Sequence, residues 1–519
     1  MSLLIVENVS HDFGGRHILE DVSFRLEKGE HVALVGANGE GKSTFLNIVT
    51  NQLMPDSGKI EWAGKVTIGY LDQHSTLTKG KSIRQVLAEA FNYLHQQNTR
   101  MLELYEQMSS ATPEQMDKMM EEVGEIQDLL EHADYYALDA KIDEFANGLG
   151  LGGIGLERDV SDLSGGQRSK VLLTKLLLQN PGILVLDEPT NYLDEEHITW
   201  LTKFLQNYEN AFILVSHDIT FINNVVNVIY HIENCELTRY TGNYEKFQEL
   251  YAIYKQQHNA AYERQQQEID QLEDFIARNK ARISTTGRAK SRQKKLDKME
   301  IIEKPREKPK PTFVFKEART PSRFVVQAKD LVIGYDTALT RPVNFSIERG
   351  QKLAIKGVNG LGKTTLLKTI LGMLPPFDGK VELGDYLEPG YFEQEERTKN
   401  ELTALEDVWQ AYPGLTNFQV RQALALCGLT NEHITSKVFV LSGGEAAKVR
   451  LCKIILKDIN FLVLDEPTNH LDVDARDELK RALQAFKGTV LLVSHDPEFY
   501  QDIVTDVLNV EDWTTKILD

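Results

Sequence analysis

The chain carries one set of motifs twice, at almost the same internal spacing. Residues 36–44 read GANGEGKST and residues 357–365 read GVNGLGKTT, and in both copies the lysine lies 31 residues before a glutamine. The leucine of a later LSGG motif lies 24 residues before the aspartate of LDEPTN in each copy, and that aspartate lies 30 residues before the histidine of VSHD. Chance does not repeat three such intervals, so two copies of one folding unit are expected.

The first motif of each copy fits the pattern G-x-x-x-x-G-K-[ST] and follows an apolar stretch typical of a buried strand. Glycines let the backbone N–H groups of such a loop point at phosphate oxygens, while the lysine reaches the β- and γ-phosphates of ATP. The hydroxyl after the lysine, in Ser43 or Thr364, is expected to ligate Mg²⁺. The predicted nucleotide-binding residues are Gly36, Asn38, Gly39, Gly41, Lys42, Ser43 and Thr44, and Gly357, Asn359, Gly360, Gly362, Lys363, Thr364 and Thr365.

Two further motifs narrow the class of NTPase. Residues 161–167 read SDLSGGQ and residues 440–445 read VLSGGE, and each is followed by an apolar run that ends in LDEPTN. With this combination the chain resembles the ABC ATPases. The resemblance implies that the LDEPTN aspartate holds Mg²⁺ through water and that the next glutamate is catalytic and polarises the attacking water. These residues are Asp187 and Glu188 in the first copy, and Asp465 and Glu466 in the second.

The same resemblance assigns roles outside these motifs. A glutamine senses the γ-phosphate and Mg²⁺, a switch histidine hydrogen-bonds phosphate and acts in catalysis, an aromatic residue stacks on adenine, and a D-loop crosses to the other half. The corresponding residues are Gln73 and Gln394, His217 and His495, Phe13 and Tyr335, and the loops 191–194 and 469–472.

In ABC ATPases the signature motif of one half closes over the nucleotide bound by the other half, which implies two composite sites. The helix behind each signature serine directs its positive end at the γ-phosphate. The first signature, Ser164, Gly165, Gly166 and Gln167, is expected to complete the site of Lys363. The second, Ser442, Gly443, Gly444 and Glu445, is expected to complete the site of Lys42. Glu445 replaces the glutamine of the first copy, which adds a carboxylate near one nucleotide and predicts a mild asymmetry.

Length and motif order predict an α/β fold with two P-loop ABC ATPase domains in tandem. The 519 residues are expected to divide into a first ATPase domain at 1–243, a helical-hairpin linker at 244–322 and a second ATPase domain at 323–519. No apolar run approaches the roughly 20 residues that cross a bilayer, so a cytoplasmic protein without a membrane partner is expected. Three scattered cysteines favour packing over a disulfide framework or a zinc site.

The linker is cationic although the chain has a formal net charge of −19. Residues 278–298 contain nine lysines or arginines against one acidic residue, Asp297. A first helix over 244–283, a turn at 284–287 and a second helix are expected. A solvated spacer is the alternative, but the sustained charge bias and the absence of aromatics at the turn favour backbone recognition of structured RNA. The predicted RNA-binding residues are Arg278, Lys280, Arg282, Ser284, Thr285, Thr286, Arg288, Lys290, Arg292, Lys294 and Lys295.

The first copy also contains an insertion. The segment from Gln73 to Leu163 is 43 residues longer than the one from Gln394 to Leu441. Thr112, Pro113 and Gln115 suit the first positions of a helix, so a helical arm over about 84–146 is expected. Its Met- and Glu-rich sequence favours a contact with a basic protein surface, although an enlarged helical subdomain is the alternative.

Twin cassettes, an arm, a basic linker and no membrane segment together resemble the ABC-F translation factors. That resemblance implies a monomer that enters the E site of the large ribosomal subunit with ATP and Mg²⁺ bound. It implies linker contacts with rRNA and P-site tRNA near the peptidyl-transferase centre, an arm near a stalk protein, and release after hydrolysis. Relief of stalled translation is favoured over antibiotic resistance because the linker turn is short and polar. The alternative of another class is the twin ATPase motor of an ABC transporter.

Overall fold

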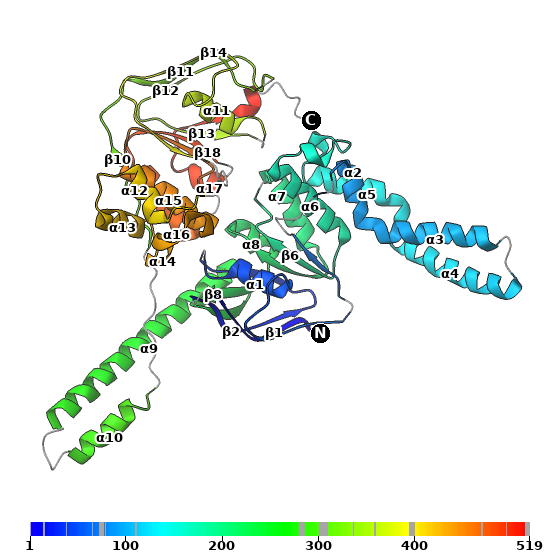
Figure 1. The fold of residues 1–519 in the computed structure, drawn as a ribbon, viewed down its shortest axis with the longest axis horizontal. Coiled ribbons are helices and arrows are strands. Elements are labelled where there is room, and N and C mark those ends of the chain that lie inside the picture. The colour runs from blue at the N-terminus through cyan, green and yellow to red at the C-terminus, as the bar shows by residue number, and fades with distance from the viewer. Residues whose placement is uncertain are drawn as a thin grey trace.

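In the computed structural model the two cassettes lie one above the other, and two helical hairpins project from them in different directions (Figure 1). The structure describes residues 2–13, 16–37, 39–64, 66–71, 77, 79–108, 112–191, 193–279, 286–299, 310–335, 337–357, 360–393, 400–468, 471–494 and 496–513. The predicted tandem arrangement of two α/β ATPase domains is confirmed.

The first cassette is built on a six-stranded sheet with the order β5-β6-β7-β3-β8-β9. Its strands are parallel except for the last pair, and β3, β6 and β7 are continuous apolar runs because both of their faces are buried. A three-stranded antiparallel sheet, β2-β1-β4, packs over one face. The bounds are β1 Ser2–Phe13, β2 Arg16–Glu27, β3 His31–Val35, β4 Ser57–Trp62, β5 Ile68–Tyr70, β6 Ile183–Asp187, β7 Ala211–Val215, β8 Val228–Glu233 and β9 Glu236–Thr241.

Helices close both faces of this sheet. Helix α1 is buried between the two sheets and carries the lysine of the first phosphate-binding loop at its first position. The signature helix α6 packs with α2, α5, α7 and α8 around the opposite face. The bounds are α1 Lys42–Val49, α2 Ile83–Ala88, α5 Leu138–Gly148, α6 Gly165–Gln179, α7 Glu195–Gln206 and α8 Ile219–Val225.

The second cassette repeats this topology. Its parallel sheet has the order β15-β17-β18-β13-β19 and its antiparallel sheet the order β12-β11-β14. The strands are β11 Phe324–Val332, β12 Val343–Glu348, β13 Lys352–Lys356, β14 Asp378–Leu383, β15 Pro389–Phe392, β17 Phe461–Asp465, β18 Thr489–Val493 and β19 Asp506–Asn509. The helices are α11 Lys363–Ile370, α12 Ala404–Ala411, α13 Asn417–Leu426, α14 Asn431–Thr435, α15 Gly443–Leu456, α16 Val473–Ala485 and α17 Pro497–Tyr500.

The chain joins the core of the second cassette before residue 323. Phe313 and Phe315 are buried in that core, and β10 (Lys316–Glu317) pairs in parallel with β16 (Asp458–Ile459). The Phe313 N–H also donates to Glu478 Oε1 at 2.8 Å. These contacts anchor the end of the linker to the second cassette.

The linker is a hairpin of α9 (Tyr244–Asn279) and α10 (Thr286–Leu296). Helix α9 has 36 residues, which extend about 54 Å at 1.5 Å per residue. The expected turn at 284–287 is wrong at its second half, because Thr286 and Gly287 belong to α10; residues 280–285 lie outside the described part. Good helix formers follow Gly287, so the helix extends back into the expected turn.

The arm is a second hairpin, of α3 (Asn92–Met108) and α4 (Pro113–His132). Helix α4 starts as expected, with Thr112 as N-cap, proline in the first turn and a reciprocal capping bond from Gln115. The methionines of α4 lie in two environments. Met119 packs against the small core of the arm, whereas Met116 and Met120 are exposed. That core is formed by Met101, Leu104, Val123, Ile126 and Leu130.

Candidate active sites

Each phosphate-binding loop holds its lysine in the same way. Lys42 Nζ donates to the carbonyls of Gly36 (2.8 Å) and Ala37 (3.0 Å), and Lys363 Nζ donates to that of Gly357 (2.6 Å). Gly41 before the lysine has φ 100°, and a Cβ there would lie 2.6 Å from Ile18 Cγ2. Only glycine fits this left-handed and crowded position, which lets the loop curl around a phosphate.

A hydroxyl and a carboxylate meet beside each lysine. Ser43 Oγ donates to Asp187 Oδ2 at 3.3 Å, and Thr364 Oγ1 donates to Asp465 Oδ2 at 2.7 Å. Within the described residues, Asp465 Oδ1 is buried and lacks a hydrogen-bond partner. No cluster of three His, Cys, Asp or Glu that could hold a metal occurs there either. Oxygen donors in this number fit Mg²⁺, which takes one or two protein carboxylates and completes its shell with phosphate and water.

The two predicted catalytic glutamates share an unusual backbone conformation. Glu188 has φ 50° and Glu466 has φ 47°, in the left-handed region that non-glycine residues rarely adopt. In each copy the glutamate N–H donates to the end of the neighbouring strand, to Val215 O at 2.8 Å and to Val493 O at 3.0 Å. The same strained backbone conformation thus recurs in both copies, as occurs at functional sites.

His217 contacts Glu188, the first of the two predicted catalytic glutamates, directly. Its backbone N–H donates to Glu188 Oε2 at 3.3 Å, and its Nε2 lies 3.3 Å from Oε1. Burial raises the pKa of Glu188 to about 7, and burial together with Glu188 raises the pKa of Asp187 to about 6. Burial and the Lys42 ammonium lower the pKa of His217 to about 4, so the imidazole is neutral at pH 7.

The aspartate at the end of each D-loop acts electrostatically on groups of the other half. Asp472 of the second half raises the pKa of Lys42 and of His217, although burial makes the net shift of both downward. Asp194 of the first half acts in the same sense on Lys363. Each D-loop aspartate therefore influences the charge of the phosphate-binding lysine in the other half.

Two lysines on the signature helices were missed by the sequence reasoning. Lys170 Nζ lies 3.5 Å from Asp194 Oδ2, and Lys448 Nζ donates to Asp472 Oδ2 at 2.6 Å. The signal was present, because both lysines lie six residues after the signature serine. Each pair connects a signature helix to the D-loop of its own half.

The signature serines cap their helices. Ser164 and Gln167 form a capping box at the start of α6, and Ser442 and Glu445 form the same box at the start of α15. Glu445 Oε2 accepts the Ser442 N–H at 2.9 Å, while Oε1 lies 3.1 Å from His433 Nε2. The substitution of glutamate for glutamine is therefore accommodated within the second half.

The two expected adenine-stacking residues are exposed, Phe13 by 51% and Tyr335 by 63%, as stacking on a base would require. Several other predicted residues cannot be compared with the structure. Those outside its described part are Asn38, Gln73, Asn359, Gln394, His495, Lys280, Arg282, Ser284 and Thr285. The same holds for the side chains of Thr286 and Arg288.

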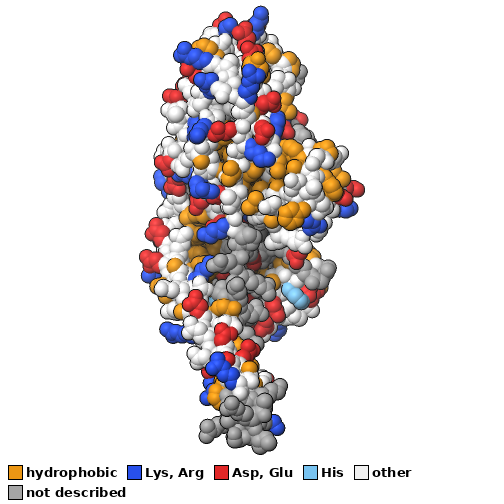
Figure 2. Space-filling model, turned by 90° about the vertical axis from the view of Figure 1, so that its left-hand side faces the viewer, with side chains coloured by type: hydrophobic (Ala, Val, Ile, Leu, Met, Phe, Trp, Pro, Cys, Tyr) orange, Lys and Arg blue, Asp and Glu red, His pale blue; other side chains and the backbone are white. Residues whose placement is uncertain are grey.

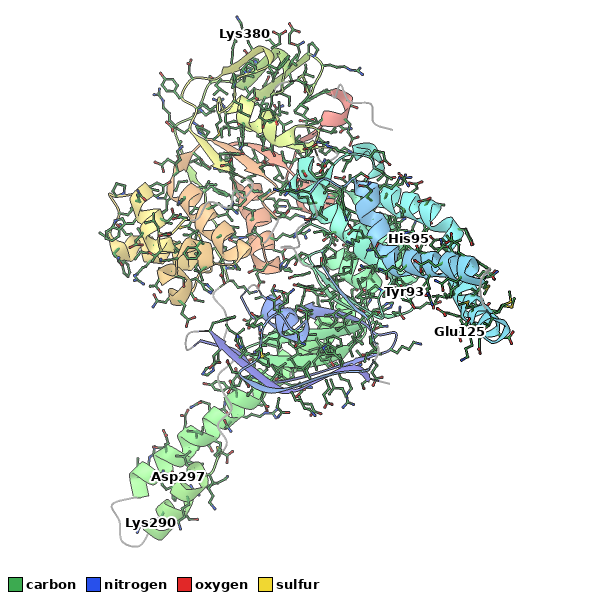
Figure 3. The ribbon with its side chains drawn as sticks, turned by 45° about the vertical axis from the view of Figure 1, so that its right-hand side comes forward. Tyr93, His95, Glu125, Lys290, Asp297 and Lys380 are labelled. Atoms are coloured by element: carbon green, nitrogen blue, oxygen red, sulfur yellow. The ribbon has the colours of Figure 1, made fainter. Side chains whose placement is uncertain are left out.

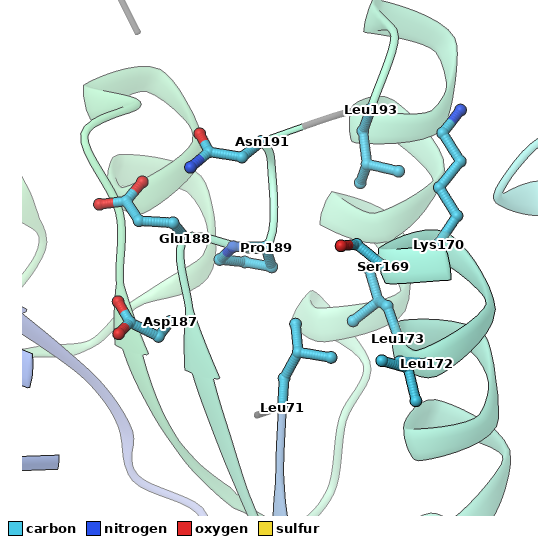
Figure 4. A pocket seen from close by; sticks show the side chains of 10 residues that line it. All are labelled: Leu71, Ser169, Lys170, Leu172, Leu173, Asp187, Glu188, Pro189, Asn191 and Leu193. Carbon is cyan, nitrogen blue, oxygen red and sulfur yellow. The ribbon is translucent and has the colours of Figure 1, made fainter. Parts of the chain in front are cut away.

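A pocket lies between the catalytic strand end and the signature helix of the first half (Figure 4). Asp187 and Glu188 line one side, and Ser169 and Lys170 of α6 line the other. Leu71, at the end of β5, forms the floor between them. The predicted catalytic carboxylates therefore lie next to the helix that carries the signature motif.

Comparison with known proteins agrees with this geometry. A family model described as ABC transporter matches residues 19–191 and 340–469, and a second model with that description matches residues 230–315. The chain is thus a twin-cassette ABC ATPase, which binds and hydrolyses ATP. It is 61% identical to the uncharacterized ABC transporter ATP-binding protein YfmM of Bacillus subtilis, over 100% of both chains. It is 37% identical to ABC transporter F family member 2 of Arabidopsis thaliana, covering 98% of this chain and 76% of that protein. The chain belongs to the F family of ABC proteins.

Solved structures show the same fold. The protein titled RNase-L Inhibitor matches with a TM-score of 0.57 at 20% identity, over 97% of this chain and 87% of that one. The archaeal ribosome recycling factor aABCE1, solved with the ribosomal stalk protein aP1, matches with the same TM-score and identity over the same shares of the two chains. Across the described residues, no helix is both long and apolar enough to cross a membrane.

Proposed function

We propose that this ATPase binds the ribosome in its ATP state through the basic linker and leaves after hydrolysis. The linker would contact rRNA and P-site tRNA from the E site of the large subunit, and this would relieve slow or stalled translation. The placement of a cationic hairpin at one end of an acidic protein carries the proposal. Membership of the F family and the titles of the solved relatives, one of them a ribosome-bound ABCE1, support it.

Some lysines and arginines of the linker hairpin already contact another side chain of the protein, and others do not. Arg278 pairs with Asp274 at 2.8 Å, Lys295 pairs with Glu268 at 2.5 Å, and the Arg292 guanidinium lies 3.6 Å from the centre of the Phe275 ring. Lys290 and Lys294 are exposed and have no ion-pair partner within the described residues. Their i, i+4 spacing on α10 places both on one face of the helix, so this face is the best candidate to receive RNA phosphates.

The hairpin lies at one end of the molecular surface. Figure 2 shows it from the linker side at the lower end, where Lys and Arg side chains lie among acidic ones. The Arg292 guanidinium stacks on Phe275 of α9, a contact that the sequence reasoning did not consider. Arg292 therefore marks the side of α10 that packs on α9, and Lys290 and Lys294 lie on the side turned away from it.

Replacing Lys290 and Lys294 with alanine should weaken binding to ribosomes and flatten its salt dependence. Each lost phosphate contact lowers the slope of log affinity against log salt by roughly 1, so a reduction of about 2 is expected. Affinity is measured by co-sedimentation at several salt concentrations. The charge-matched control replaces Lys380 and Lys487, exposed lysines of the second cassette; Lys380 lies on β14 at the opposite end of the molecule from Lys290 (Figure 3). If the slope of log affinity against log salt is the same for both variants, the hairpin is not part of the RNA interface.

The test of the whole proposal is nucleotide-dependent binding. A variant carrying Glu188→Gln and Glu466→Gln, which should retain ATP, is sedimented with ribosomes through sucrose in ATP or in ADP. Co-sedimentation in ATP alone is the expected result. Absence of binding in both nucleotides would contradict the ribosomal role and favour the motor of a transporter.

In this proposal the two halves act through composite sites. Lys42 and Lys363 hold phosphates, and Ser43 with Asp187 and Thr364 with Asp465 would hold Mg²⁺, which neutralises phosphate charge when bound. Glu188 and Glu466 orient the attacking water, with His217 fixing Glu188. Closure of the halves would set the angle of the linker, because α9 begins on the first cassette and the linker ends in the core of the second.

A further inference from the structure

A buried histidine, His11, packs against Phe13, the predicted adenine-stacking residue of the first site. His11 on β1 is only 6% exposed, and neither ring nitrogen has a hydrogen-bond partner in the part of the chain that the structure describes. Its ring meets the Phe13 ring edge to face, with centroids 4.7 Å apart and an interplanar angle of 90°. A buried polar ring without hydrogen bonds is costly, so its retention here needs a physical explanation.

A nearby carboxylate is already engaged by the backbone. Asp56 Oδ2 lies 3.3 Å from His11 Nδ1, but it accepts the Asp12 N–H at 2.7 Å and is not aligned for a hydrogen bond with the ring. The Asp12 carboxylate is in turn 2.7 Å from His17 Nδ1. The end of β1 is therefore fixed around His11, and the His11 ring stays perpendicular to the Phe13 ring.

The second copy has a different arrangement. Ile333 stands two residues before Tyr335, as His11 does before Phe13. Ile333 is buried too, but its aliphatic side chain cannot form an aromatic contact with Tyr335. Tyr335 is instead contacted at its hydroxyl, which lies 3.4 Å from Thr365 Oγ1 of the phosphate-binding loop. Phe13 thus packs against the ring of His11, whereas Tyr335 is hydrogen-bonded through its hydroxyl to the phosphate-binding loop.

We propose that His11 is a positioning residue of the first nucleotide site: its ring holds the Phe13 ring in a fixed, perpendicular orientation, so that the adenine of ATP stacks on the exposed face of Phe13. This inference rests on the proposed role of Phe13 in adenine stacking. The aromatic residue that stacks on adenine is then held differently in the two sites. Phe13 is held by the ring of His11 in the first site, and Tyr335 is held by Thr365 in the second.

The test compares ATP with tripolyphosphate, which has the phosphates but no base. Both are titrated with Mg²⁺ into the full chain carrying Lys363→Ala, which weakens the second site. His11→Ile, which installs the residue of the second copy, should raise the Kd for ATP roughly three- to tenfold, the range of an edge-to-face aromatic pair. The Kd for tripolyphosphate should change less than about twofold. His11→Phe keeps an edge-to-face ring and should restore ATP binding.

Phe13→Ala should weaken ATP binding at least as much, and adding His11→Ile to it should cause no further loss. Ile333→Val is the matched control and should leave the Kd unchanged in this background. If His11→Ile weakens the binding of ATP and of tripolyphosphate equally, the substitution acts on the phosphate-binding loop and the inference is wrong. If Phe13→Ala matters and His11→Ile does not, the inference alone fails. If Phe13→Ala has no effect, the proposed adenine stacking fails with it.

Discussion

Replacing Glu188 and Glu466 with glutamine should slow ATP hydrolysis by roughly 10² to 10⁴ while ATP still binds, because each site loses the carboxylate that orients water. Glutamine keeps the size of the side chain and an oxygen that can accept the His217 N–H, so the fold of the site is retained. Steady-state phosphate release measures turnover, and equilibrium titration measures ATP binding. Each single variant reports on one site.

Glu445→Gln is the charge-matched control for this experiment. It removes a carboxylate from the signature motif and installs the residue of the first copy, and a glutamine can form the same capping box. Turnover within about threefold of the unchanged protein is expected, since the capping oxygen is retained. Normal hydrolysis in the doubly substituted protein would refute the catalytic assignment of both glutamates.

Replacing Lys448 with methionine should lower the free energy of unfolding by about 3 kcal/mol, because it leaves Asp472 largely buried without its counter-ion. The measurement is urea unfolding. Combining Lys448→Met with Asp472→Asn should cost less than the two single changes added together, since no unpaired charge remains. Lys329→Met is the control: it breaks the exposed pair with Glu382 (3.1 Å) and should cost less than about 1 kcal/mol.

The same pair predicts a pH dependence. Burial alone would raise the pKa of Asp472, but the Lys448 ammonium and the Ala475 N–H outweigh burial and lower it. A lowered carboxylate pKa stabilises the folded state above the unfolded value of about 3.9, and this stabilisation is lost as the pH falls further. The stability difference between the unchanged protein and Asp472→Asn should therefore be full at pH 7 and shrink below about pH 4. A difference that is constant over this range would contradict the ion pair.

Several predictions failed or were incomplete for identifiable reasons. The expected linker turn included Thr286 and Gly287, but both belong to α10, because the good helix formers that follow them extend the helix to Thr286. The expected effect of Glu445 on a nearby nucleotide stays a prediction, and the sequence did not reveal that its carboxylate contacts Ser442 and His433 of its own half. Sequence spacing does not report rotamers.

The sequence by itself determined the two cassettes, their phosphate-binding loops and carboxylates, the arm and the cationic linker, because duplicated spacing and glycine patterns are local properties of the chain. Only the tertiary structure decided which groups from distant segments meet. It paired Lys448 with Asp472, set the buried His11 ring against Phe13, and let each D-loop aspartate act electrostatically on the lysine of the other half. Such contacts depend on how sheets and helices pack, and burial and charge then fix the pKa and orientation of each side chain.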